Sequence, residues 1–328
     1  MTSTTTARLA KSDLKAQEKA AKRAEKERQK RIAADEKAER KRAAKSGFAN
    51  VNNPRRSTLM TVLCVVFAVY CLFPFVYLLI NATKTQADFT STFGLGFGKT
   101  FALWDNLVTV FTYQGGIFGR WLINTILYVV AGAGGATLLA IMGGYALAKF
   151  RFPGRKAVFA VLIGSISVPG IALAVPQFLL FAKLNLTNTP AAMIIPSLIS
   201  PFGLYLMWIF SEQAVPDELL EAARVDGAGE FRIFAQIILP NAVPAILTVG
   251  MFNFMGNWND LLWPLIMTSK PETRTITAGL AMLTGHGSSV TPYGVVMAGA
   301  LISALPLLIV FFFVQKRFVE GIAMTGMK

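Results

Sequence analysis

The chain of 328 residues contains few side chains that could catalyse a reaction, and they do not form a known catalytic set. Residues 98–100 are Gly-Lys-Thr, the order that ends a phosphate-binding loop, but the position of that loop's first glycine holds Phe93. His286 is the only histidine and lies in a Gly/Ser-rich loop, so we expect neither a Ser–His–Asp triad nor a histidine metal site. We therefore predict that the chain is not an enzyme, holds no cofactor or metal and does not hydrolyse ATP.

The most specific pattern of residues at fixed separations in the chain starts in a charged segment at 211–236. It contains Glu-Ala-Ala at 221–223, a glycine at 227 and, ten residues farther on, Ile-Ile-Leu-Pro at 237–240. Such a set of fixed positions rarely arises by chance in one chain. The residues that we expect to carry its function are Glu221, Ala222, Ala223, Asp226, Gly227, Leu239 and Pro240.

The same segment predicts a short helix and a turn. Pro216 can begin a helix because the N–H that it lacks would have no partner there, and the two acidic residues after it suit the positive helix end. Gly227 has the position of a left-handed residue that ends a helix. A second helical run starts at Glu230. The predicted structure is a short, rigid helical projection with one small, smooth face made of Leu219, Ala222 and Ala223.

The composition indicates a membrane protein. Hydrophobic residues make up 54% of the chain, charged residues only 15%, and the mean hydropathy is +0.51. Six uncharged stretches each exceed the roughly 20 residues that a helix needs to cross a bilayer; they are 57–83, 121–148, 157–182, 184–211, 233–259 and 275–315. We therefore predict an all-α fold, a polytopic membrane bundle of six transmembrane helices.

Glycine and proline inside these stretches predict close packing and breaks. The run Ala-Gly-Ala-Gly-Gly at 131–135 and the glycine pair at 143–144 would let neighbouring helices approach closely. Pro169 interrupts the third stretch and Pro240 the fifth. Such breaks are tolerated where neighbouring helices or water satisfy the freed carbonyls, which favours a bundle that lines a path.

Basic residues predict the orientation. The first 56 residues hold seventeen Lys and Arg, and the loop after the second stretch holds four, whereas Lys183 is alone between the third and fourth stretches. This distribution places both termini in the cytoplasm. The loop at 211–232 then lies there too, although its six acidic residues outnumber two arginines. We interpret that acidic excess as a surface that binds a partner protein.

Residues 1–56 form a basic N-terminal tail that we predict to be separate from the membrane domain at 57–328. Residues 8–45 consist mainly of Ala, Lys, Glu and Arg, with too few apolar residues to bury a core. A disordered or solvated helical tail is expected, and anionic lipid headgroups are the ligands that its charge would attract. The basic excess is concentrated in this tail and does not indicate nucleic-acid binding.

Polar residues gather at 253–260, near the end of the fifth stretch. Asn253 and Asn257 are candidates for lining a path through the membrane. Asp260 follows the start of this stretch by about 20 residues, so we expect it at the outer membrane interface. Trp258 and Trp263 are then expected to belong to the aromatic belt.

These patterns together resemble the permease subunits of bacterial ATP-binding-cassette importers, and the charged segment is similar to their EAA loop. The similarity extends over residues 57–328. Residues 258–264 (Trp-Asn-Asp-Leu-Leu-Trp-Pro) and the tail at 318–328 are similar to the six-span, maltose-permease-like members that import carbohydrates. The resemblance implies a subunit of the bacterial inner membrane that imports an oligosaccharide or another sugar and forms half of the translocation path.

The resemblance also implies partners. These are a second, non-identical permease, a dimer of cytoplasmic ATPases and an extracytoplasmic sugar-binding protein. In such permeases the residues matching Glu221, Ala222, Ala223 and Gly227 couple the membrane subunit to the ATPase. The loop at 275–292 would reach toward the binding protein, and the C-terminal tail would lie near the ATPase interface. The resemblance implies no role for the basic tail.

Two other functions stay open at this point. An ion-coupled secondary transporter would use carboxylates in the membrane, but Asp260 is the only acid in a span-like segment. A membrane-anchored enzyme or scaffold would use the basic tail, but it lacks a catalytic set. Co-purification of a soluble ATPase would distinguish the importer from both.

Overall fold

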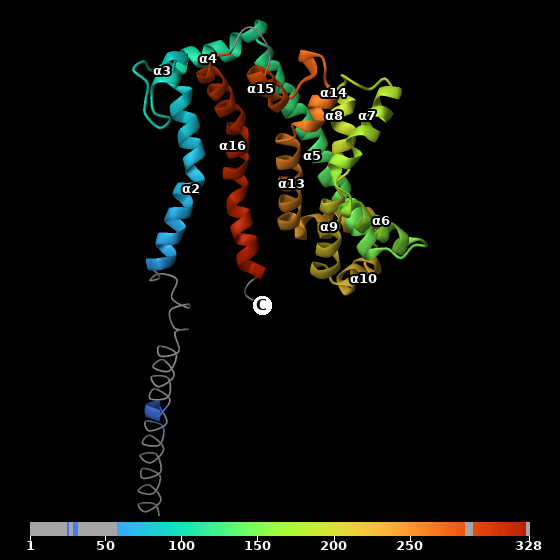
Figure 1. The fold of residues 1–328 in the computed structure, drawn as a ribbon. Coiled ribbons are helices and arrows are strands. Elements are labelled where there is room, and N and C mark those ends of the chain that lie inside the picture. Colours follow the sequence, from blue (N-terminus) through green and yellow to red (C-terminus); the bar gives the residue numbers. More distant parts are fainter. Residues whose placement is uncertain (1–24, 26–28, 32–57, 286–290, 326–328) are drawn as a thin grey trace, which may run out of the picture. The chain divides into compact units, whose positions relative to one another are not determined.

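A computed structural model of the chain describes residues 25, 29–31, 58–285 and 291–325, and within these residues the regular structure is helical, without a β-strand (Figure 1). The chain divides into two compact units, residues 1–73 and 74–328. Most of the basic tail, and with it the predicted disorder or solvation, lies outside the described residues. His286 and the last three residues lie outside them as well.

Helix α2 (Thr58–Ala82) begins in the first unit and ends in the second. The main helices that follow it are α3 (Gln86–Ser91), α4 (Leu103–Thr112), α5 (Ile117–Lys149), α6 (Arg155–Ser167), α7 (Ala174–Lys183), α8 (Pro190–Ser197), α9 (Pro201–Ala214), α10 (Asp217–Val225), α11 (Glu230–Ile233), α12 (Leu239–Asn241), α13 (Val243–Trp258), α14 (Leu262–Met267), α15 (Ile276–Gly285) and α16 (Tyr293–Thr325).

Within the described residues, four helical segments are long and apolar enough to cross a membrane: α2, α5, α8 together with α9, and the first 23 residues of α16. Two further pairs reach this length together but are bent, α6 with the helix at Gly170–Lys183 by 98° and Glu230–Asn241 with α13 by 80°. Counting each bent pair as one span gives the six predicted crossings. The all-α membrane fold is confirmed, whereas the cytoplasmic position of both termini stays a prediction.

The two bends occur at prolines that the sequence places inside apolar stretches. Pro169 follows the end of α6 in an extended conformation. In the other pair a π-helical turn, η4 (Phe234–Ile238), precedes α12, and the break lies at Ala242, between Pro240 and Pro244, neither of which has an N–H to continue the helical hydrogen bonds. The Asn241 side-chain amide donates to the Ile237 carbonyl over 2.7 Å and so satisfies one backbone group at the break.

Helix α5 is the central helix of the second unit and packs against α4, α8, α9, α13 and α15 (Figure 1). A methyl group added at Gly144 would lie 2.7 Å from the backbone nitrogen of Trp208 on α9, and one at Gly132 would overlap the Ser197 hydroxyl. The predicted close approach of helices is confirmed at these two glycines. Gly134, in the same run, has no neighbour that a methyl group would meet.

Candidate functional site

The predicted short helix of the charged segment is α10, and it ends as the sequence indicates. Gly227 has a φ of +80°. Its amide donates to the Arg224 carbonyl and the Ala228 amide donates to the Ala223 carbonyl, both over 3.0 Å. This paired termination places the residue at 227 in the left-handed region, which glycine adopts without steric cost. The chain therefore turns sharply out of α10 and into α11.

Helix α10 has an inward and an outward face, and the neighbours Ala222 and Ala223 lie on different ones. Leu219, Ala222 and Val225 are exposed, with 87% of the Val225 surface accessible. Leu220 and Ala223 instead pack into an apolar cluster with Tyr145, Val215, Ile233 and Ile238. The prediction of one face with Leu219, Ala222 and Ala223 is therefore wrong, because adjacent residues are rotated by about 100° around a helix.

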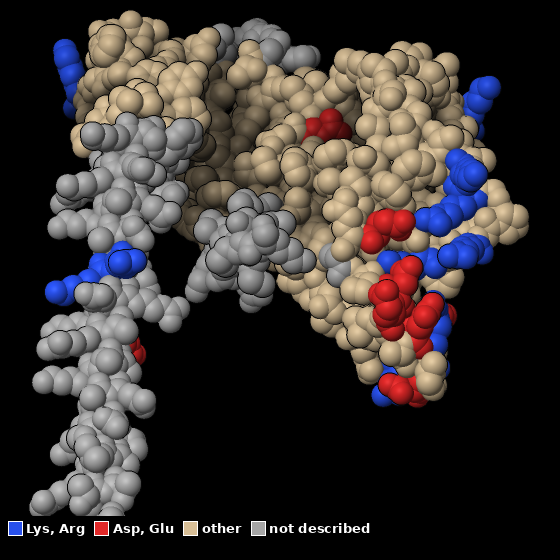
Figure 2. Space-filling model, turned by 90° about the horizontal axis from the view of Figure 1, so that it is seen from below, with Lys and Arg blue, Asp and Glu red and all other residues tan. Residues whose placement is uncertain are grey.

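Helix α11 also carries an exposed apolar side chain. Phe231 exposes 83% of its surface, and an ion pair of 2.7 Å between Arg224 and Glu230 joins α10 to α11. We call the four exposed apolar residues the apolar tip: Leu219, Ala222, Val225 and Phe231. Figure 2 shows acidic and basic side chains gathered at one side of the lower face, while most of the described surface in this view is neither acidic nor basic. An exposed apolar patch rimmed by charges is typical of a surface that docks a protein.

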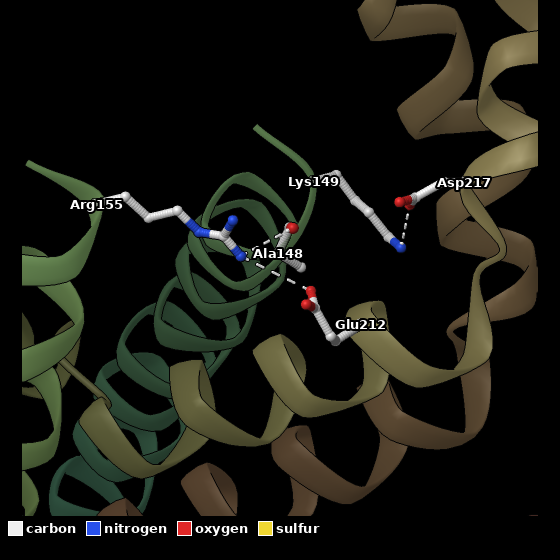
Figure 3. Close-up of polar contacts among 5 residues, drawn as sticks. All are labelled: Ala148, Lys149, Arg155, Glu212 and Asp217. Atoms are coloured by element: carbon white, nitrogen blue, oxygen red, sulfur yellow. Dashed lines mark hydrogen bonds and ion pairs between the residues drawn. The ribbon is translucent and has the colours of Figure 1, made fainter. Parts of the chain in front are cut away.

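The first residue of α10 is anchored to the end of α5 (Figure 3). The Lys149 ammonium donates to Asp217 Oδ1 over 2.6 Å. Only 6% of the Lys149 side chain is exposed, against 72% for Asp217. The hydrogen bond from Lys149 is the main reason that the pKa of the Asp217 carboxyl lies below its ordinary value.

A second contact joins α6 to α9 beside this ion pair (Figure 3). One Arg155 guanidinium nitrogen donates to the Ala148 carbonyl over 3.1 Å and lies 3.8 Å from a Glu212 carboxylate oxygen. The two contacts together involve four charged residues: Lys149, Arg155, Glu212 and Asp217. The sequence alone does not predict these pairs, although it indicates a basic loop and an acidic loop on the same predicted side of the membrane.

Leu239 and Pro240 lie apart from the apolar tip. Leu239 packs against a cluster of α5, α9 and α13 that includes Met207 and Val249. Pro240 is exposed in α12, at the bend between the two parts of the fifth span. The structure therefore places these two residues at a bend that connects α11 to the membrane helix α13, and places Glu221, Asp226 and Gly227 at exposed positions in and beside α10.

Asn253 and Asn257 both line a cavity of about 460 Å³ at the opposite end of α13 from α10. Asn253 connects three helices, because its amide donates to the Thr137 hydroxyl over 3.1 Å and its oxygen accepts from the Ser200 hydroxyl over 2.7 Å. The Asn257 side-chain amide donates to the backbone carbonyl of Asn253, one helical turn earlier, over 2.8 Å. The structure thus brings the two predicted path-lining residues together on one polar wall.

Asp260 lines the same cavity. Its Oδ1 accepts from the Trp263 amide over 3.3 Å at the start of α14. The expectation that Trp258 and Trp263 belong to an aromatic belt is wrong. Trp258 is 4% exposed and donates to the Ser303 carbonyl, and the Trp263 indole donates to the Ala192 carbonyl. Both indoles join helices instead of facing a membrane interface.

The Gly-Lys-Thr run at 98–100 is held by a carboxylate. The backbone amides of Lys99 and Thr100 donate to the Asp88 carboxylate over 3.2 and 3.3 Å. The Lys99 amide is the main reason that the pKa of the Asp88 carboxyl lies below its ordinary value. The amides that would hold a phosphate in a phosphate-binding loop are thus occupied by an acidic side chain.

The loop at 275–292 begins with α15, which is fixed to α5. The Ile276 amide donates to the Thr125 hydroxyl over 2.8 Å, and just before the loop the Trp121 indole donates to the Pro271 carbonyl over 2.8 Å. The C-terminal tail continues α16 as far as Thr325. Residues 286–290, at the centre of the loop, lie outside the described part of the chain.

Comparison with known proteins gives one family for the larger part of the chain. Residues 136–323 match the family described as binding-protein-dependent transport system inner membrane component. The chain is 30% identical over 278 residues to the arabinooligosaccharides transport system permease protein of Halalkalibacterium halodurans, covering 84% of this chain and 98% of that protein. It is 34% identical over 254 residues to the lactose transport system permease protein of Rhizobium radiobacter, covering 76% and 89%.

A solved structure has the same fold. It is that of a bacterial ABC transporter involved in the import of the acidic polysaccharide alginate, with a TM-score of 0.68 and 23% sequence identity. The similarity covers 79% of this chain and 95% of that one.

Proposed function

Because the chain belongs to the family of binding-protein-dependent transport system inner membrane components, we propose that α10 is the surface through which a cytoplasmic ATPase drives it. The chain is a multi-pass membrane protein and a permease subunit of an importer. The proposed location is the bacterial inner membrane, where the chain would pair with a second permease and receive its cargo from an extracytoplasmic binding protein.

The observation that carries the coupling role is the combination of an exposed apolar tip and a fixed base. Val225 and Phe231 project from α10 and α11 without intramolecular cover, while Leu220 and Ala223 hold the opposite face against the bundle. An exposed apolar patch is typical of a protein interaction site. Because the opposite face of α10 is packed against the bundle, a movement of the docked partner would displace the bundle with it. The exposed acid Glu221 lies on the same helix and would face that partner.

The path of transmission runs along α5. The Lys149–Asp217 ion pair ties α10 to one end of this helix, and Tyr128 and Val129 of the same helix line the cavity. The bend at Pro240 supplies a second connection, from α11 into α13, which carries Asn253 and Asn257. A displacement of α10 would therefore reach both walls of the cavity through continuous helices.

The proposed cargo is a sugar. Support comes from the relatives, whose names specify arabinooligosaccharides and lactose, and from the transporter with the same fold, which imports an acidic polysaccharide. These cargoes include an uncharged sugar and an anionic polymer, so the names alone do not select a charge. A cavity of about 460 Å³ lies within the range of roughly 300–1,000 Å³ that is usual for small-ligand sites.

The test is co-purification of the ATPase with the permease from membranes that contain the complete transporter. Glu221→Lys and Val225→Asp should each lower the amount of bound ATPase several-fold, because a reversed charge or a buried carboxylate at a protein interface is unfavourable. Glu272→Lys is the matched control, since this exposed acid lies outside the charged segment. Wild-type amounts of ATPase with both α10 variants would remove the coupling role from this helix.

A further inference from the structure

We propose that the cavity lined by Asn253, Asn257 and Asp260 binds an uncharged sugar unit and disfavours anionic sugars. This inference rests on the proposed function and specifies the cargo. It starts from the side chains that line the cavity, on α5, α7, α8, α13 and α14.

The lining has the chemistry that sugars require. Side-chain amides of Gln177, Asn253 and Asn257 supply donors and acceptors that match sugar hydroxyls. Tyr128 and Trp263 add aromatic rings, which can cover the apolar C–H face of a sugar ring. Small-ligand sites combine such an apolar wall with a few convergent polar groups.

Three other cavities in the described part of the chain lack this combination. One, between α5, α13 and α16, has Thr137 as its sole polar side chain. Another, between α4 and α16, has Thr112, and the third, between α5, α6 and α9, has Ser165 and Ser200. Their linings are otherwise apolar, as expected where helices face lipid or a partner subunit. The polar cavity is therefore a specific feature of one region of the bundle.

The polar wall is held in place before any ligand arrives. Asn253 is fixed by Thr137 on α5 and by Ser200 at the start of α9, and Asn257 is fixed by the Asn253 carbonyl. Fixed amides bind a ligand without losing further side-chain freedom. The fixed amides therefore favour binding of a sugar in the cavity and do more than line the path.

The charge of the lining selects against anions. Asp260 is the only charged side chain among the described residues that line the cavity, and no Lys or Arg accompanies it. Arg274 is next in sequence to the lining residue Thr275 but does not itself line the cavity, and its guanidinium donates to the Ser269 carbonyl. A carboxylate has about four acceptor positions, so Asp260 can bond the Trp263 amide and still accept from a sugar hydroxyl. A second carboxylate or a phosphate nearby would be repelled.

The experiment measures the charge preference of the cavity directly in the assembled transporter. Gln177→Cys is introduced with Cys64→Ser and Cys71→Ser, and the thiol is labelled with a cationic trimethylammonium or an anionic sulfonate methanethiosulfonate. The cationic reagent should react about tenfold faster, after correction for its rate with a free thiol. Asp260→Asn should remove most of this difference, and Glu272→Gln, which removes an acid outside the cavity, should leave it unchanged.

The preference between uncharged and anionic sugars is measured as their protection of the same thiol from labelling. Lactose, which is uncharged, should slow its labelling more than lactobionate, its anionic derivative, and Asp260→Asn should reduce the gap. Equal rates for the two reagents, or lactobionate protecting at least as well as lactose, would overturn the inference. Neither result depends on α10, and ATPase co-purification reports independently on the proposed function.

Discussion

The Lys149 ammonium lies 2.6 Å from the Asp217 carboxylate, and this contact joins the last residue of α5 to the first residue of α10. Lys149 is nearly buried and Asp217 is mostly exposed. Burial in the bundle therefore fixes the Lys149 side chain, and its ion pair with Asp217 fixes the start of α10. Tyr128, on the cavity wall, lies roughly 30 Å from Lys149 along the same helix at 1.5 Å per residue. The ion pair thus connects the proposed ATPase surface to the proposed sugar site.

Asp217→Asn should impair coupling more than Lys149→Met. The first variant leaves a nearly buried ammonium without its counter-charge, whereas the second leaves an exposed carboxylate that water can solvate. The measurement is the stimulation of ATP hydrolysis by the binding protein in the reconstituted transporter. Exchanging the pair, Lys149→Asp with Asp217→Lys, should restore part of the stimulation. Identical stimulation in the single variants and the wild type would show that the pair does not transmit motion.

The ion pair should persist throughout the neutral range. Lys149 lowers the pKa of Asp217 below 3.8, so the stabilisation is complete above that value and is lost only as the pH falls through the lowered pKa. The difference in thermal stability between wild type and Asp217→Asn should therefore stay constant from about pH 8 to about pH 5. A difference that vanishes near neutral pH would contradict this assignment.

Gly227→Val should misdirect the chain after α10. A branched side chain in the left-handed conformation costs roughly 1–2 kcal/mol, and the two hydrogen bonds that end the helix depend on that conformation. Less ATPase should co-purify from membranes with matched permease levels. Gly229→Val is the control, because Gly229 has an ordinary φ of −71° and is also exposed. Equal losses from the two variants would remove the special role of residue 227.

Gly144→Ala should destabilise the bundle, because its methyl group would press on the Met207 and Trp208 backbone of α9. Gly134→Ala, in the same helix, meets no neighbouring atom and should be neutral or stabilising by up to about 1 kcal/mol. The melting temperature of the purified complex in detergent distinguishes the two. A higher melting temperature for Gly144→Ala than for Gly134→Ala would refute the close approach of α5 and α9.

Deletion of residues 1–45 should leave transport near the wild-type level. These residues contain almost no apolar area to bury, so the membrane domain should fold without them, although membrane insertion could fall. Uptake is compared at equal permease levels in membranes. Loss of uptake at normal levels would show that the basic tail has a role in transport.

Features that depend on local spacing were predictable from the sequence. Gly227 indicated the end of α10, and Asn253 and Asn257, one helical turn apart, indicated one polar wall. Ala222 and Ala223 were wrongly assigned to the same face, although adjacent residues are rotated by about 100° around a helix; the sequence does not show which of the two the bundle covers. Trp258 and Trp263 were misplaced because the sequence does not show that their indoles donate to carbonyls of other helices. The Lys149–Asp217 pair was missed because it joins the ends of two helices that are distant in sequence and that only the folded bundle brings together.

The most direct test of the coupling role is site-specific photo-crosslinking from the apolar tip. A benzophenone amino acid replaces Val225 in the complete transporter, and adducts are identified by mass spectrometry after irradiation. Trp104, exposed on α4, serves as the control position. We expect an adduct with the ATP-binding-cassette subunit from position 225 and none from position 104. Absence of that adduct at position 225, with the ATPase present in the complex, would contradict the central claim that α10 is its docking surface.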